Sequence, residues 1–82
     1  MLVALSIHEY FLVFGWELTM NKKYFIRDHL KAFDNALRKG YSLDGVMYME
    51  SLRDTQDDGK TYFFDIFKHK VSRQRFLIRY HQ

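Results

Sequence analysis

Apolar and polar positions alternate along residues 8–20. The even positions are apolar from Tyr10 to Met20, whereas the odd positions are mixed. A period of two is typical of a β-strand that buries one face. The pattern therefore predicts one long strand over residues 8–20, with Gly15 as the point for a bend or bulge. Residues 2–7 either extend this strand or form a short strand of their own.

The period changes after residue 21. Apolar residues then recur at spacings of four, three and four, with three more beside them: Ile26, Leu30, Phe33 and Leu37, then Phe25, Ala32 and Ala36. This spacing predicts an amphipathic helix over residues 22–39 whose apolar arc packs on the core. We expect Asn21 as its N-cap and Gly40 as the residue that ends it.

Three more apolar runs follow the helix. Residues 46–52 and 61–67 flank a turn signal at 57–60, and residues 74–80 alternate again. The first run also has a helical alternative, because Met, Glu and Leu favour helices. The order strand, helix, strand, strand, strand predicts an α+β fold. In it, one amphipathic helix packs on a mainly antiparallel sheet of about four strands, in two layers.

The composition limits the size and class of the protein. The chain has 82 residues, of which 48% are hydrophobic and 18% aromatic, so we expect a single globular domain over residues 1–82. It has no cysteine, which excludes disulfides and cysteine zinc sites. The first apolar run ends at His8, far short of the roughly 20 residues that a membrane span needs. No signal peptide is recognised either, so a cytoplasmic protein is expected.

Charge is concentrated at the C-terminal end. Residues 44–65 carry six acids and two bases, whereas residues 66–82 carry five bases and no acid. Such a segment favours a polyanion as partner. When lysine and arginine neutralise the polyanion, its bound counterions are released, and this release favours binding. The alternative is a solvated face that keeps an aromatic-rich protein soluble. The predicted nucleic-acid-binding residues are Lys68, Lys70, Arg73, Arg75 and Arg79.

Arginine and aromatic side chains on a sheet suit single-stranded RNA better than a DNA major groove. We therefore expect a small, non-catalytic, RNA-binding regulatory protein. The opposite face of the helix supplies a secondary basic face, formed by Lys23, Arg27, Lys31 and Arg38. Two aromatic residues are candidates for stacking on bases, Phe63 and Phe67.

One stretch resembles the aromatic strand motif of RRM domains. The matching residues are Lys60, Tyr62, Phe64 and Phe67, and the departures are Thr61, Phe63 and Asp65. The resemblance covers eight residues, and the chain has one clear helix where that fold needs two. The other interpretation is that Tyr62, Phe64 and Ile66 are core residues of an ordinary strand.

Catalytic and metal-binding patterns are weak. The run from Asp54 to Asp65 loosely resembles a calcium loop, but an acidic hairpin turn fits it better. The four histidines lack metal-ligand spacing, and no serine lies in a nucleophile motif. We therefore expect no enzyme activity, no metal and no cofactor.

An alternative function is a protein inhibitor or adaptor that binds a host enzyme or ribonucleoprotein, as phage-type antitoxins and counter-defence proteins do. The acidic segment 44–58 offers a surface for it, together with Tyr41, Met47, Tyr48 and Met49. A homodimer that pairs free strand edges is a third alternative.

Overall fold

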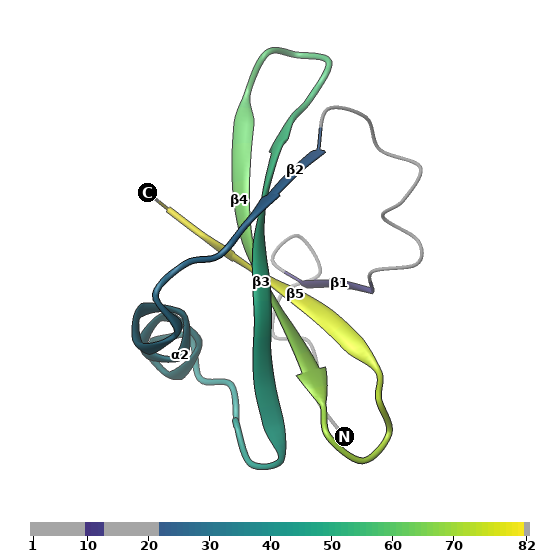
Figure 1. Ribbon diagram of the computed structural model, residues 1–82. Coiled ribbons are helices and arrows are strands. Elements are labelled where there is room, and N and C mark those ends of the chain that lie inside the picture. The colour runs from purple at the N-terminus through teal and green to yellow at the C-terminus, as the bar shows by residue number, and fades with distance from the viewer. Residues whose placement is uncertain (1–9, 13–21, 82) are drawn as a thin grey trace.

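The chain folds into an antiparallel sheet with one helix against it (Figure 1). The computed structural model describes residues 10–12 and 22–81. In space the strands follow the order β1-β5-β4-β3-β2, and every neighbouring pair is antiparallel. The elements are β1 (Tyr10–Leu12), β2 (Lys22–Phe25), α2 (His29–Arg38), β3 (Val46–Thr55), β4 (Thr61–His69) and β5 (Arg75–Tyr80).

The predicted α+β class is confirmed, and from β2 onward so is the order strand, helix, strand, strand, strand. The described sheet has five strands, because β1 adds one at the free edge of β5. β1 lies within the strand predicted over residues 8–20. The other residues of that predicted strand, including Gly15, lie outside the described residues. Residues 2–7 also lie outside them. The helical alternative for residues 46–52 is wrong, since they belong to β3.

The helix is shorter than the sequence predicted. Residues 22–25 form β2 and pair with β3, so the helix does not begin at residue 22. Asn21 is therefore not its N-cap. That position belongs to Asp28, whose carboxylate accepts a hydrogen bond from the backbone N–H of Leu30 at 2.9 Å. The predicted end is confirmed, because Gly40 takes a positive φ of 89° and follows the last turn.

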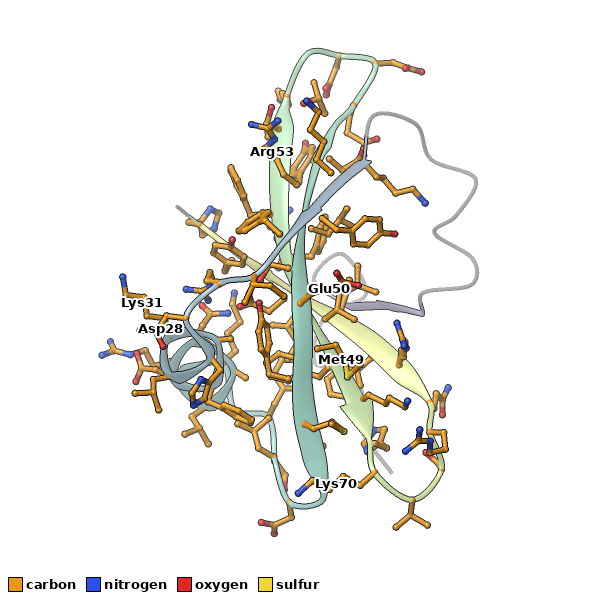
Figure 2. All side chains as sticks on the ribbon, viewed as in Figure 1. Asp28, Lys31, Met49, Glu50, Arg53 and Lys70 are labelled. Atoms are coloured by element: carbon orange, nitrogen blue, oxygen red, sulfur yellow. The ribbon has the colours of Figure 1, made fainter. Side chains whose placement is uncertain are left out.

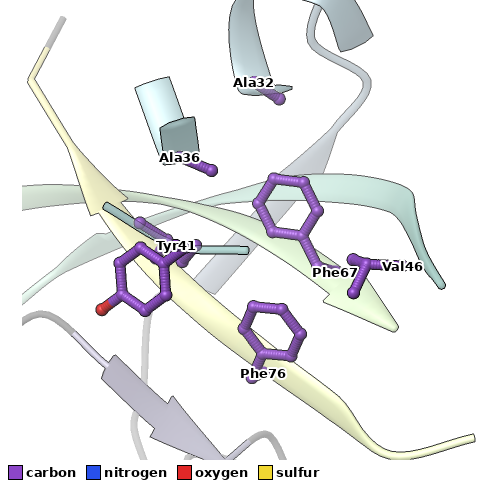
Figure 3. Packing of buried hydrophobic residues seen from close by; sticks show 7 residues of the cluster. Ala32, Ala36, Tyr41, Val46, Phe67 and Phe76 are labelled. Carbon is purple, nitrogen blue, oxygen red and sulfur yellow. The ribbon is translucent and has the colours of Figure 1, made fainter. Parts of the chain in front are cut away.

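Small residues bring α2 close to the sheet. Ala32 and Ala36 are fully buried against Phe67 and Phe76, whose rings stack at 5.6 Å (Figure 3). The remaining members of this core are Tyr41, Val46 and Ile78, with Phe33, Leu43 and Tyr48 packed beside them.

The predicted orientation of the helix needs correction. Leu30 and Leu37 are exposed and not core residues, whereas the alanines at the edge of the predicted arc face the sheet. An alanine face allows the helix backbone to approach the large aromatic rings of β4 and β5, which already fill the space between the layers.

A second core cluster occupies the other face of the sheet. It consists of Leu52, Phe64, Ile66 and Leu77, with Met49 and Tyr62 partly buried beside it. Side chains alternate between the faces along each strand, so Phe64 and Ile66 point away from α2 while Phe67 points toward it. The structure therefore confirms the core interpretation of Phe64 and Ile66.

The two hairpins of the meander lie at opposite ends of β4 (Figure 1). The β3–β4 hairpin turns at Gly59, with a φ of 83°, and carries Asp57 and Asp58. Its hydrogen bonds, such as Gln56 N to Lys60 O at 2.8 Å, make it the acidic turn that the sequence predicted. The β4–β5 hairpin carries Lys68, Lys70, Arg73 and Arg75.

Candidate nucleic-acid interface

Backbone hydrogen bonds fix the shape of the β4–β5 hairpin. His69 N donates to Gln74 O at 2.9 Å, and Arg73 N donates to His69 O at the same distance. Arg73 takes a φ of 67°, a left-handed conformation that is uncommon for a residue with a side chain. Lys70 N donates to Gly45 O at 2.8 Å, which attaches the hairpin to the loop before β3. The basic side chains therefore project from a defined turn.

Four of the five predicted nucleic-acid-binding residues gather at this hairpin. We call this set the basic tip: Lys68, Lys70, Arg73 and Arg75. Lys68 and Arg75 are direct cross-strand partners, and Lys70 marks the end of the molecule in Figure 2. Within the described residues none of the four forms an ion pair. The basic tip is thus a concentration of positive charge without internal compensation.

Burial and the positive charge of the basic tip affect the pKa of Lys68. Partial burial lowers the pKa of its ammonium group, and the positive charges of Arg73 and Arg75 lower that pKa further. Like charges held together in this way favour a bound anion, because its negative charge offsets their mutual repulsion. The apolar side chain of Val71 stands at the apex of the same turn and is 94% exposed.

Arg79 lies apart from the basic tip. It is four residues beyond Arg75 on β5, or about 13 Å along an extended strand. Its guanidinium carbon lies 5.8 Å from the centre of the Tyr62 ring. Its Nε is buried and has no hydrogen-bond partner in the described structure. The sequence could not distinguish Arg79 from the other four predicted residues. Alternation along a strand predicts which face of the sheet a side chain lies on, but not which side chains surround it.

A hollow of about 290 Å³ surrounds this arginine at the end of β5. We call it the aromatic hollow; its lining residues are Thr61, Tyr62, Phe63, Arg79, Tyr80 and His81. The rings of Phe63 and Tyr80 are 5.7 Å apart within it. Arginine and aromatic side chains that line one hollow suit a planar base with an attached phosphate. The sequence analysis did not identify Tyr62 and Tyr80 as site residues.

The two predicted stacking residues differ in exposure. Phe63 is partly exposed and lines the aromatic hollow, whereas Phe67 is fully buried between Phe33 and Phe76. The prediction that Phe67 stacks on a base is therefore wrong. Phe67 faces α2, and no base reaches a ring in that core.

The predicted secondary basic face is only partly available. Lys23 and Lys31 are exposed, but Arg38 is paired with Asp34 at 2.7 Å and Arg27 with Asp65 at 2.6 Å. A second hollow, of about 320 Å³, lies between α2 and the end of β5 and adjoins the aromatic hollow at Tyr80 and His81. Its other lining residues are Arg27, Lys31, Asp34, Asn35 and Arg38. Lys23 lies outside it.

Arg27 belongs to a buried polar network. Its guanidinium makes two hydrogen bonds to the fully buried carboxylate of Asp65, which also accepts one from Ser51 Oγ at 2.7 Å. Tyr48 Oη completes the network. It is hydrogen-bonded to Ser51 Oγ and accepts a hydrogen bond from the backbone N–H of Arg27. The same guanidinium lies 3.9 Å from the centre of the Tyr80 ring. The bond to Asp65 raises the pKa of Arg27, which is therefore a structural cation.

The acidic segment 44–58 does not form one continuous surface. Tyr41 and Asp54 are buried, and Tyr48 is partly buried in the core near α2. Burial raises the pKa of Asp54, and Asp57 raises it further against the opposing effects of Lys22 and Gln56. The exposed acids of this segment lie at the two ends of β3.

No helix in the described residues is long and apolar enough to cross a membrane. No protein-family model matches the sequence, no curated protein is significantly similar to it, and no solved structure is significantly similar to its fold. The function must therefore be argued from the charge and geometry of the described surface.

Proposed function

We propose that the protein is a small, non-catalytic, cytoplasmic RNA-binding regulator that contacts phosphates through the basic tip. The observation that carries this proposal is the clustering of the four cations without an ion pair in the described structure. Neutralising phosphates with such a cluster releases counterions, which gives an affinity that falls steeply with salt.

The aromatic hollow supports a single-stranded ligand. Bases in a duplex are stacked on one another, so only an unpaired base presents a free face to Tyr62 or Phe63. In this proposal Arg79, which lines the same hollow, binds the phosphate of that nucleotide. The basic tip and the aromatic hollow lie at opposite ends of β5, so a single strand that contacts both must span the length of this strand.

The experiment is fluorescence anisotropy with labelled single-stranded RNA and duplex DNA over a range of salt. The double variant Lys70→Glu with Arg73→Glu should abolish RNA binding while circular dichroism shows an intact fold. Lys23→Glu with Lys60→Glu is the matched control, since it reverses the same number of exposed charges outside the basic tip. Retained affinity in the folded tip variant contradicts the proposal, as does a salt-independent affinity in the unsubstituted protein.

The aromatic hollow has its own test. Tyr62→Ala should weaken binding of a single strand by about 1–3 kcal/mol, the range for one stacked base. Tyr62→Phe keeps the ring and should bind as the unsubstituted protein does. If Tyr62→Ala also binds normally, the hollow takes no base and the basic tip acts alone.

A second candidate function is the inhibitor or adaptor that binds a protein. One observation favours a protein contact, the exposed apolar residues on the outer side of α2. This function predicts a stoichiometric complex that tolerates salt, whereas RNA binding at the basic tip does not tolerate it.

A further inference from the structure

The second hollow, between α2 and the end of β5, has no part in the RNA contact proposed above. It shares Tyr80 and His81 with the aromatic hollow, so the two hollows adjoin, and we call them together the joint hollow. Their volumes are about 290 and 320 Å³, and sites for small ligands occupy about 300–1,000 Å³. The joint hollow therefore has room for a group beyond one stacked base.

The ring of Tyr80 contacts both halves of the joint hollow. Its centre lies 5.7 Å from the centre of the Phe63 ring, which lines only the aromatic hollow. The guanidinium carbon of Arg27, which lines only the second hollow, lies 3.9 Å from the centre of the same Tyr80 ring. A ligand that stacks beside Phe63 therefore has the charged side chains of the second hollow next to it.

The second hollow is lined mainly by charged side chains. Two of its cations are compensated by ion pairs, Arg27 with Asp65 and Arg38 with Asp34. Lys31 forms no ion pair within the described residues, and Figure 2 shows it on the same side of the molecule as the end of β5. Lys31 therefore leaves the second hollow with an excess of positive charge, which favours an anionic group.

A second stacked base suits the second hollow less well than an anion does. Its only aromatic side chains are Tyr80 and His81, and both also line the aromatic hollow. The side-chain amide of Asn35 donates to the backbone carbonyl of Arg79 at 3.5 Å, which connects α2 to the end of β5. The two halves of the joint hollow are thus held beside each other by a contact between their own elements.

The cations of the joint hollow match the order of groups in a nucleic-acid strand. Arg79 lines only the aromatic hollow and Lys31 only the second hollow, so each half supplies one cation. A nucleoside within a strand carries one phosphate on each side of its sugar. Arginine binds phosphate through its planar fork, and lysine binds it as a point charge with three donors. When Arg79 binds one of these phosphates, Lys31 is the cation beside the other.

From these observations we propose that the joint hollow binds one nucleotide of a single strand with a phosphate on each side, one held by Arg79 and the other by Lys31. The proposal rests on the proposed function, because the base of this nucleotide stacks in the aromatic hollow. It extends the RNA contact from β5 onto α2. A bound strand then runs from the basic tip along β5 and reaches the helix.

NMR titration of the isotope-labelled full chain with small nucleotides tests the proposal, because these probes are too short to reach the basic tip. The probes are adenosine, the two adenosine monophosphates with a phosphate on one chain-forming hydroxyl, and the adenosine bisphosphate with a phosphate on both. The bisphosphate should bind about fivefold more tightly than either monophosphate, the effect of one exposed charge pair. Its binding should shift amide signals of α2 as well as those at the end of β5.

Three variants assign the second phosphate to the second hollow. Lys31→Gln should lower the affinity for the bisphosphate about fivefold and leave that for adenosine unchanged. Lys23→Gln is the matched control, since it removes an exposed lysine that lies outside both hollows. Asp34→Asn should raise the affinity for the bisphosphate, because it removes an opposing charge from the hollow and leaves Arg38 uncompensated.

The proposal is overturned if the bisphosphate binds no more tightly than the monophosphates, if Lys31→Gln behaves as Lys23→Gln does, or if none of the probes binds. Failure of the proposed function is a separate result, because it is judged with RNA and the double variant of Lys70 and Arg73. Loss of RNA binding in that double variant, together with a bisphosphate affinity independent of Lys31, would contradict only the second phosphate contact.

Discussion

Arg27 and Asp65, 38 positions apart in the sequence, form a bidentate ion pair. Nε of Arg27 donates to Oδ1 of Asp65 at 2.9 Å, and Nη2 donates to Oδ2 at 2.6 Å. Arg27 lies in the connection between β2 and α2, and Asp65 points from the middle of β4 toward the helix. The pair therefore fixes the start of the helix over the centre of the sheet. It also removes from the surface a cation that the sequence placed on a basic face.

The first prediction concerns this pair. Arg27→Met should destabilise the fold by about 3–5 kcal/mol, because it leaves the Asp65 carboxylate buried without its cation. The double variant Arg27→Met with Asp65→Leu should recover most of this loss, since no charge is then buried. Urea denaturation measures both free energies of unfolding. Equal destabilisation in the single and double variants would show that the network acts through something other than charge compensation.

The second prediction tests the orientation of α2. Ala36→Leu should cost about 1–3 kcal/mol, because the larger side chain meets Phe67 and Phe76 in a filled core. Leu37→Ala should change stability by less than about 0.5 kcal/mol, because the Leu37 side chain is exposed. The sequence-based orientation, with Leu37 in the core, predicts instead a loss of about 2–5 kcal/mol for Leu37→Ala. Thermal or urea unfolding of the two variants decides between the orientations.

Why the sequence misplaced this helix can be traced to particular residues. A period of 3.6 identifies an apolar stripe but does not say whether the stripe meets the core or another surface. The spacing of Leu30 and Leu37 puts both in the apolar stripe, and the sequence therefore predicts both in the core. The rings of Phe67 and Phe76 occupy that space, so the alanines lie beneath the helix. The predicted start is wrong because Phe25 and Ile26 extend the apolar arc ahead of the helix, whereas residues 22–25 pair with β3.

The meander was more predictable, because its turns carry strong local signals. Asp57–Lys60 and Ser72 mark the two hairpins, and the strands lie between them. The sequence did not predict the register shift of β3 between Tyr48 and Glu50. It puts Tyr48 and Ser51 on the same face of the sheet, which the buried network requires and a strict period of two excludes. For the site, sequence clustering identified the basic tip but not the tertiary contact of Arg79 with Tyr62.

The third prediction concerns Asp54, whose pKa is raised above the ordinary 3.8 by burial. The folded state then holds its proton more tightly than the unfolded state, so this group lowers stability as the pH rises through the raised pKa. Asp54→Asn removes the charge and keeps an acceptor for Gln56. The variant should have a higher Tm than the unsubstituted protein at pH 7, and the difference should vanish at a pH below 3.8. A lower Tm at pH 7 would contradict the assignment.

The fourth prediction concerns Lys68, whose pKa is lowered below 10.5. Its positive charge is therefore lost at a lower pH than that of an ordinary lysine. Affinity for single-stranded RNA should decline as the pH rises toward 10.5, because the free protein then has to take up a proton to bind. Lys68→Arg keeps its charge over this range and should show a smaller decline. Anisotropy titrations at several pH values measure both, and identical pH profiles would place Lys68 outside the binding surface.

Asp57 and Asp58 lie in the hairpin at one end of β4, and the basic tip lies at the other end. β4 spans nine residues, or about 30 Å, so the charges of the two hairpins are separated by more than the screening length of about 8 Å at physiological salt. A ligand at the basic tip is therefore screened from the charges of the other hairpin. Reversing Asp57 and Asp58 to lysine should accordingly leave any contact at the basic tip unchanged, because the two hairpins act as electrostatically separate surfaces.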